Sequence, residues 1–499
     1  MSLKNNVLAN YFGQGWTALM GLAFIPLYIR YLGVEAWGLV AFMSMLQAWL
    51  TLLDLGLTPT LSREMARFQA GEHSTQSIRD LLRSLELIFG GVAVAVASIV
   101  WLLAPWVASQ WFTAARLPLG TVSQAVASMG LVLAARMLEQ VYRGAVQGLQ
   151  RQVWLNGAQA IVATVRWAGA VVVLMYLANS IEAFFVWQGV VSVLSVILMA
   201  RQTYLWLPRS ARSGRFDRAA LVRIRPFAAG VAATTLLVLL LTQVDKLLLS
   251  KLVPLEEFGY YALAASVSGA LYFLISPVAT AASPRMAELV SQGQVQLIID
   301  TYHGASQWLA AILIPAALVM ASFAQPLLLT WTGNLGLALR AAPLLSLLAL
   351  GTLCNGLMNV PYLTQLAYGW SGFAARVNMV AVCLIVPAIL WSVPRFGAIG
   401  AAWAWLALNA GYVLVSIHFM HVRLLRGEKR RWFRDAVIQP LGVGAVIVLT
   451  LRGLIELPHE RIAAAATLIG ITVFVTGVVF LSMPIPRARL CRRWQSSRG

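Results

Sequence analysis

The stretch LLVLLLTQVDKLLLSKLVPLEEFGYYA, residues 236–262, decides how this chain is interpreted. It places Asp245 and Lys246 side by side within an apolar run that is long enough to cross a bilayer. A charged side chain at the centre of a membrane helix costs about 2.5–3.5 kcal/mol on insertion scales, so it faces a partner or a wet cavity. Two interpretations are open: a functional cavity, or a self-neutralised pair near a helix end, with Lys246 reaching to the interface.

The composition of the whole chain indicates a membrane protein. Of its 499 residues, 60% are hydrophobic and only 11% are charged, whereas soluble domains carry roughly 25% charged residues. The three cysteines lie far apart, which argues against a disulfide or metal framework. The chain has no GxxxxGK[ST] or HExxH motif, so we expect neither ATP hydrolysis nor a metal or other cofactor.

Hydropathy predicts about fourteen membrane spans. They are 8–30, 36–57, 84–104, 121–147, 154–178, 183–205, 226–250, 258–283, 304–325, 341–366, 374–393, 397–420, 435–453 and 461–482. All are expected to be helices, because the polar segments between them are short and the apolar runs lack the alternation of a barrel strand.

The distribution of Lys and Arg predicts the orientation. With the N-terminus inside, most of the 37 Lys and Arg residues fall in cytoplasmic segments, as the positive-inside rule requires. Both termini are therefore expected in the cytoplasm. The formal net charge of +19 then indicates contact with anionic lipids rather than with nucleic acid.

A weak internal repeat divides the chain near its middle. Sliding the sequence by 221 residues places Glu35 on Glu256 and Gly38 on Gly259. Each copy holds an even number of spans, which predicts parallel repeats. We expect an all-α polytopic membrane protein with two pseudo-symmetric six-helix lobes and two C-terminal helices. The predicted parts are an N-lobe (1–205, helices 1–6), a basic cytoplasmic linker (206–225), a C-lobe (226–422, helices 7–12), and helices 13–14 with a basic cytoplasmic tail (423–499).

Charged side chains within the fourth and fifth spans mark a candidate site. Four polar residues fall at helical spacings i, i+3, i+4 and i+7 and so share one face: Arg136, Glu139, Gln140 and Arg143. The alternative is an Arg136–Glu139 pair that neutralises itself. Arg166 lies about twelve residues from the inner end of its span, or ~18 Å deep. It has no acidic neighbour within one turn, so it requires a distant partner or an anionic ligand.

Two sets of candidate site residues follow from these patterns. The predicted substrate ligands are Arg166, Arg136, Lys246, Arg30, Gln47, Gln243, Asn359 and Tyr362. The predicted ion-coupling residues are Asp245, Glu139 and Asp54. Arg30 and Asp54 lie at span ends, where a structural role as cap or interfacial anchor is an equally good interpretation.

Several stretches resemble the O-antigen and oligosaccharide flippases of the polysaccharide transporter family. They are IPLYIRYLGVEAWGLVAF (25–42), LLDLGLTPTLSREMARF (52–68), QVDKLLLSKLVPLEEFGYYALA (243–264), SPVATAASPRMAELVSQGQ (276–294), NGLMNVPYLTQLAYGW (355–370) and FGAIGAAWAWLALNAGYVLV (396–415). The resemblance implies membership of the superfamily that also holds multidrug extruders and the lipid II flippase. It implies an undecaprenyl-pyrophosphate-linked oligosaccharide as substrate, moved from the inner to the outer leaflet of a bacterial inner membrane. A proton or sodium gradient is the implied energy source, and a polymerase and a chain-length regulator are possible partners.

Buried arginines suit such a substrate, because the guanidinium group forms charge-assisted, often bidentate bonds to phosphate. Two alternatives stay open. A drug or metabolite extruder of the same superfamily would need an acidic cavity for cations. A membrane-embedded glycan polymerase or ligase would more naturally show paired carboxylates on a sizeable polar loop. We therefore expect a transporter rather than an enzyme.

Overall fold

The computed structural model describes residues 3–210 and 212–484, and the backbone alone at residues 3–11, 219–221 and 223–234. Within these ranges the chain is helical and forms no strand. It divides into two compact units, Met1–Gly259 and Tyr260–Gly499, which are described separately below. The predicted division into an N-lobe, a basic linker and a C-lobe rests on an internal repeat, and it stays a prediction.

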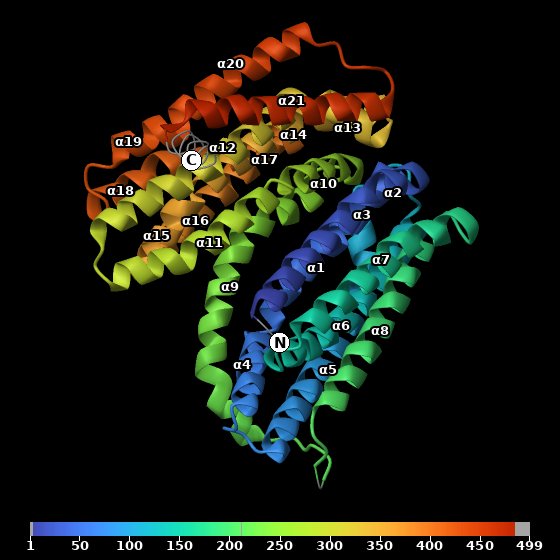
Figure 1. Ribbon diagram of the computed structural model, residues 1–499. Helices are drawn as coiled ribbons and strands as arrows, with labels where there is room; N and C mark the ends of the chain where they lie inside the picture. The colour runs from blue at the N-terminus through green and yellow to red at the C-terminus, as the bar shows by residue number, and fades with distance from the viewer. Residues whose placement is uncertain (1–2, 211, 485–499) are drawn as a thin grey trace. The chain divides into compact units, whose positions relative to one another are not determined.

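The helices of the first unit run roughly alongside one another (Figure 1). They are α1 (Leu3–Ala23), α2 (Ile25–Leu32), α3 (Val34–Leu53), α4 (Leu57–Gln69), α5 (Thr75–Trp106), the π-helical η1 (Val107–Trp111), α6 (Leu119–Gly148), α7 (Gln152–Tyr176), α8 (Ile181–Trp206), α9 (Arg218–Leu252) and the first turn of α10 (Leu255–Gly269).

The second unit continues from the rest of α10. It holds α11 (Tyr272–Ser291), α12 (Val295–Ser322), α13 (Ala324–Thr332), α14 (Leu335–Leu357), α15 (Asn359–Ala367), α16 (Ser371–Phe396), α17 (Ala398–Gly411), the π-helical η2 (Tyr412–Ser416), α18 (Ile417–Arg423), α19 (Lys429–Phe433), the π-helical η3 (Arg434–Ile438), α20 (Gln439–Leu454) and α21 (Arg461–Ser482).

Thirteen helical segments of the described chain are long and apolar enough to cross a membrane. Each overlaps one of the predicted spans, which confirms an all-α, multi-pass membrane protein. The remaining predicted span, 226–250, falls within α9, which is not among the thirteen. The predicted total of fourteen is therefore consistent with the structure, but one span of it stays a prediction.

Helix α6 lies at the centre of the first unit, against α4, α5 and α8. Its approach to α4 depends on residues without side chains. A Cβ atom at Gly144 would lie 2.9 Å from the carbonyl oxygen of Thr58, and one at Gly148 would overlap the carbonyl oxygen of Ser62. Small residues four positions apart let membrane helices pack backbone to backbone. This contact places the end of α3 and the start of α4 beside the polar face of α6.

The predicted basic linker is held against the start of α5. Arg79 donates from Nε to the carbonyl oxygen of Pro208 at 2.9 Å. The backbone amides of Arg215 and Asp217 donate to Asp80 Oδ1 and to Ser84 Oγ, each at 2.7 Å. The described residues of this linker therefore follow a defined path along the first unit.

The core of the second unit forms around α12, which packs against α11, α14, α20 and α21. Helix α19 is fixed to it by polar contacts: Trp432 donates from Nε1 to Ser306 Oγ at 3.1 Å, and His303 Nε2 lies 2.7 Å from Glu428 Oε2. Helices α16 and α17 pack against each other, with α17 also against α14.

Candidate functional site

A polar cavity of about 190 Å³ lies inside the first unit. Eight of its eleven lining residues are polar, in helices that are otherwise apolar: Gln47, Thr51, Asp54, Arg136, Glu139, Gln140, Arg143 and Arg166. They come from α3 and its C-cap, from α6 and from α7. Half of these eight polar residues belong to the stripe that the helical spacing predicted on the fourth span.

The polar face of α6 is the main wall of the cavity. Arg136, Glu139, Gln140 and Arg143 all line it, which confirms that these four residues share one face. The opposite side of α6 carries apolar side chains such as Val141 and Ala145, which are 1% and 0% exposed. Burial of those side chains orients the helix and leaves its polar stripe directed into the cavity.

Arg136 is held by two amide side chains from neighbouring helices. It donates from Nη1 to Oε1 of Gln47 on α3 and from Nη2 to Oε1 of Gln188 on α8 at 3.4 Å. Its Nε has no hydrogen-bond partner among the described residues, and the same holds for the Nε2 atoms of Gln47 and Gln188. Arg136 thus bonds to these amides, whereas Glu139 is paired with another arginine.

That arginine is Arg166, which lies on α7. Its Nη2 is 4.0 Å from Oε2 of Glu139, with 14% and 9% of the two side chains exposed. This distance brings the charges together but is too long for a hydrogen bond. Accordingly, Nε and Nη2 of Arg166 have no hydrogen-bond partner in the described part of the chain. The distant acidic partner expected for Arg166 is present, yet it leaves two donors free.

A second contact joins the same faces of α6 and α7. When the Gln159 amide is oriented with its oxygen toward Arg143, that oxygen accepts from Nε at 2.8 Å and from Nη2 at 3.0 Å. Gln159 and Arg166 are seven residues apart and share one helix face. One face of α7 therefore makes two contacts with α6: Gln159 with Arg143, and, two turns further along α7, Arg166 with Glu139.

Asp54 caps the start of α4 and also lines the cavity, and its ion-coupling role stays a prediction. Its Oδ1 accepts from the backbone N–H of Thr58 at 2.9 Å and from the Thr58 hydroxyl at 2.6 Å, which satisfies a donor in the first turn of α4. It also lines the cavity. A structural cap at this position contributes negative charge to the site.

The charges and free donors of the cavity favour an anionic ligand. Three arginines face two carboxylates there, so the formal charge is positive. A buried donor without an acceptor costs about 1–3 kcal/mol, and an acceptor-rich anion would remove that cost at Arg136 and Arg166 together. The volume lies below the ~300 Å³ at which pockets enclose drug-sized ligands. It suits a phosphate or diphosphate group rather than a whole oligosaccharide.

The other predicted residues do not line this cavity. Lys246 donates to the Thr242 carbonyl oxygen at 2.9 Å and to Gln243 Oε1 at 3.5 Å, so it bonds back onto α9. Asp245, beside it, is 9% exposed. Arg30 is exposed in the last turn of α2.

Asn359 and Tyr362 belong to α15 of the second unit. Tyr362 is 40% exposed. Their predicted role as substrate ligands stays a prediction.

Sequence reasoning missed the two amides that hold arginines in place. Gln188 is fully buried, and Gln159 contacts Arg143. The available signal was the presence of an amide within each apolar span. Such a residue indicates a polar partner in a neighbouring helix, but it does not indicate which one.

Comparison with solved structures identifies the class to which this fold belongs. The lipid II flippase MurJ in an inward closed conformation matches with a TM-score of 0.72 at 11% identity, covering 95% of this chain and 98% of that one. An inward-facing multidrug resistance MATE family transporter of the MOP superfamily matches with a TM-score of 0.60 at 12% identity, covering 87% and 97%. The chain therefore shares its fold with these two membrane transporters.

The family follows from the sequence comparisons. The chain belongs to the polysaccharide biosynthesis protein family, whose model matches residues 3–290. The MatE family model also matches, at residues 231–391. A putative O-antigen transporter of Shigella flexneri is 17% identical over 405 residues, 81% of this chain and 94% of that protein. These matches confirm the resemblance found in the sequence.

Proposed function

We propose that this protein moves a polyprenyl-pyrophosphate-linked oligosaccharide from the inner to the outer leaflet of a bacterial inner membrane by alternating access. The observation that carries the proposal is the set of buried guanidinium donors of Arg136 and Arg166 that lack acceptors in a positively charged cavity. Support also comes from relatives whose names specify O-antigen and lipid II as what they move.

The chemistry of the substrate explains why such a cavity is needed. A pyrophosphate that leaves water loses its hydration, and arginine forks replace that hydration with fixed, charge-assisted hydrogen bonds. Amides such as those of Gln47 and Gln188 offer further donors beside Arg136. The cavity then binds the charged linkage, which is common to lipid-linked glycans with different sugars.

Glu139 is a candidate ion-coupling residue within the cavity. Its carboxylate lies 4.0 Å from Arg166, so an anion that binds Arg166 competes with Glu139 for that guanidinium group. Glu139 is therefore the carboxylate whose pairing changes when the anion binds. Asp245 on α9 is the second candidate for binding a countertransported proton or sodium ion.

A flipping assay in liposomes tests the proposal. The purified protein is reconstituted with a fluorescent polyprenyl-pyrophosphate oligosaccharide, and exposure of the sugar to an added glycosidase is followed in time. We expect Arg136→Gln and Arg166→Gln to abolish flipping at equal protein content, and Arg212→Gln, in the exposed linker, to leave it unchanged. Flipping by Arg166→Gln at the wild-type rate would remove the cavity from the mechanism.

An extruder of drugs or metabolites is the second candidate, and two observations favour it. The MatE model matches residues 231–391, and multidrug transporters share the fold. Against it, the cavity carries more arginines than carboxylates, which disfavours cationic drugs. Transport of a cationic dye by the same liposomes, in place of the lipid-linked glycan, would establish this alternative.

A further inference from the structure

We propose that a groove between α16 and the α17–η2–α18 segment of the second unit binds the polyprenyl chain of the substrate, with its phosphate group held at Arg376 and Arg423. This inference rests on the proposed function, because it gives a second site to the same lipid. The groove belongs to the second unit, whereas the polar cavity belongs to the first.

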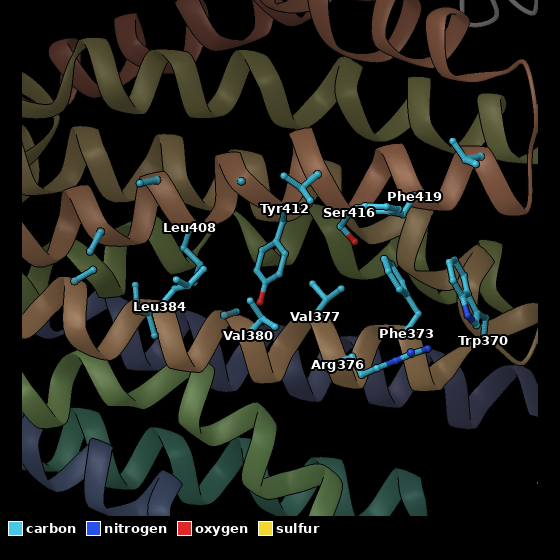
Figure 2. Close-up of a pocket in the computed structure, with 18 of the residues that line it drawn as sticks. Trp370, Phe373, Arg376, Val377, Val380, Leu384, Leu408, Tyr412, Ser416 and Phe419 are labelled. Carbon is cyan, nitrogen blue, oxygen red and sulfur yellow. The ribbon is translucent and has the colours of Figure 1, made fainter.

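The walls of the groove are apolar and open to the surroundings. It has a volume of about 860 Å³. Figure 2 shows Val380 and Leu384 of α16 facing Leu408 and Phe419 of the opposite segment. Val380, Leu384 and Phe419 are 58%, 62% and 51% exposed. In a bilayer, side chains of this kind contact hydrocarbon, so the ligand of this groove is a lipid chain.

The length of the groove distinguishes between kinds of lipid. Along α16 its lining runs from the N-cap residue Trp370 to Ala388, which at 1.5 Å per residue is about 27 Å. The hydrocarbon core of a bilayer is ~30 Å thick, so the groove continues past the midplane. The acyl chains of a phospholipid occupy one leaflet only. A polyprenyl chain is long enough to fill the groove through both leaflets.

One end of the groove is cationic. Arg376 and Arg423 line it, both are exposed, and no acidic residue is among its lining residues. The Arg423 guanidinium lies 4.6 Å from the centre of the Trp370 ring. This cation–π contact holds Arg423 at the cationic end of the groove, called its mouth below. Arg376 donates from Nε to the carbonyl oxygen of Gly372 at 3.1 Å. Two held guanidinium groups at the end of an apolar groove complement a phosphate on a hydrocarbon chain.

The orientation predicted from Lys and Arg places this mouth in the cytoplasmic leaflet, the side from which the substrate is taken. The groove would therefore hold the lipid before its pyrophosphate is transferred. Its shape is fixed by Tyr412, which Figure 2 shows directed from η2 toward α16. The Tyr412 hydroxyl donates to Asn378 Oδ1 at 3.2 Å. Tyr412 also begins a π-helical segment, an irregularity that is frequent at functional sites.

Direct lipid binding to the full-length protein tests the inference. The purified protein in nanodiscs is titrated with undecaprenyl phosphate, with farnesyl phosphate and with phosphatidylglycerol, and binding is quantified by native mass spectrometry. We expect undecaprenyl phosphate to bind more tightly than both of the others. Replacement of Arg376 and Arg423 together by Gln should weaken it about tenfold or more, since charge-assisted contacts are lost. Arg426→Gln, an exposed arginine outside the groove, is the matched control.

A second pair of variants tests the apolar wall. Leu384→Trp should fill the groove and weaken undecaprenyl phosphate binding, whereas Met379→Trp, 57% exposed on α16 but outside the groove, should not. Equal binding of undecaprenyl and farnesyl phosphate, or unchanged binding in Leu384→Trp, would overturn the inference. Preferred binding of phosphatidylglycerol would instead identify an ordinary phospholipid site.

The same titration separates this inference from the proposed function. The Arg136→Gln and Arg166→Gln variants should still bind undecaprenyl phosphate at the groove, although they fail to flip the glycan. Loss of binding in those two variants would place the lipid phosphate in the polar cavity and overturn the groove assignment. Wild-type protein that binds undecaprenyl phosphate at the groove but flips no glycan would overturn the proposed function alone.

Discussion

Replacing Arg166 by Lys keeps the positive charge of the cavity and removes the guanidinium fork. In the structure, Nε and Nη2 of Arg166 are the donors without acceptors, and a diphosphate would take both. Each charge-assisted hydrogen bond contributes about 1.5–3 kcal/mol, and 1.4 kcal/mol is a factor of ten. Loss of one bond in Arg166→Lys should therefore weaken pyrophosphate binding about ten- to a hundredfold. Arg166→Gln, which also loses the charge, should weaken it at least a hundredfold.

The assay is calorimetric titration of the purified protein with inorganic pyrophosphate. Removing Arg166 leaves the Glu139 carboxylate, 9% exposed, without its neighbouring charge, so lower stability must be separated from lost binding. The double variant Arg166→Gln/Glu139→Gln removes both charges and should recover the thermal midpoint but not the affinity. If the double variant binds pyrophosphate as the wild type does, or if Arg166→Lys loses nothing, Arg166 is a structural charge and the reasoning is refuted.

Four further predictions follow from particular contacts. Glu139→Gln should bind pyrophosphate more tightly in calorimetry, because it removes the carboxylate that competes with the ligand for Arg166. Glu35 accepts from three backbone amides of residues 115–117, so Glu35→Ala should lower stability by about 1–3 kcal/mol or more per amide left unpaired, measured by thermal unfolding. Burial raises the pKa of Glu64, but hydrogen bonds with Arg63 and His73 and the nearby arginine charges have the larger effect and lower it. The wild type should therefore be more stable than Glu64→Gln near neutral pH. This difference in stability should disappear at acid pH, where the Glu64 carboxylate is protonated in the folded state. In a cysteine-free background, Arg212→Cys should be labelled from the cytoplasmic side and Leu335→Cys from the outside; the reverse would invert the orientation.

The fold class was accessible from the sequence because membrane insertion is governed by local hydropathy. An apolar run of about twenty residues must be helical in lipid, whatever its neighbours are. For that reason thirteen predicted spans match helical segments of the structure. The polar stripe of α6 was accessible for a similar reason, since the spacing from Arg136 to Arg143 depends only on the helical period.

The composition of the site depended on tertiary structure. The sequence indicates that Arg166 needs a distant acidic partner, but Glu139 is only one of several carboxylates in the chain. The contacts of Gln188 with Arg136 and of Gln159 with Arg143 likewise join residues of different helices. Asp245 and Lys246 show that a sequence signal can also mislead. Their charges within an apolar span made them candidate site residues, yet neither lines the polar cavity.

The sequence by itself therefore determined which segments cross the membrane and which face of α6 is polar, because both follow from interactions along one helix. Tertiary structure alone decided which charges meet and where the apolar groove runs. Those features depend on the rotation and spacing of packed helices. Burial of side chains such as Val141 and close contacts such as that of Gly144 with Thr58 set that rotation and spacing. A change in rotation of one residue, about 100°, would turn Arg166 away from Glu139 without altering any hydropathy.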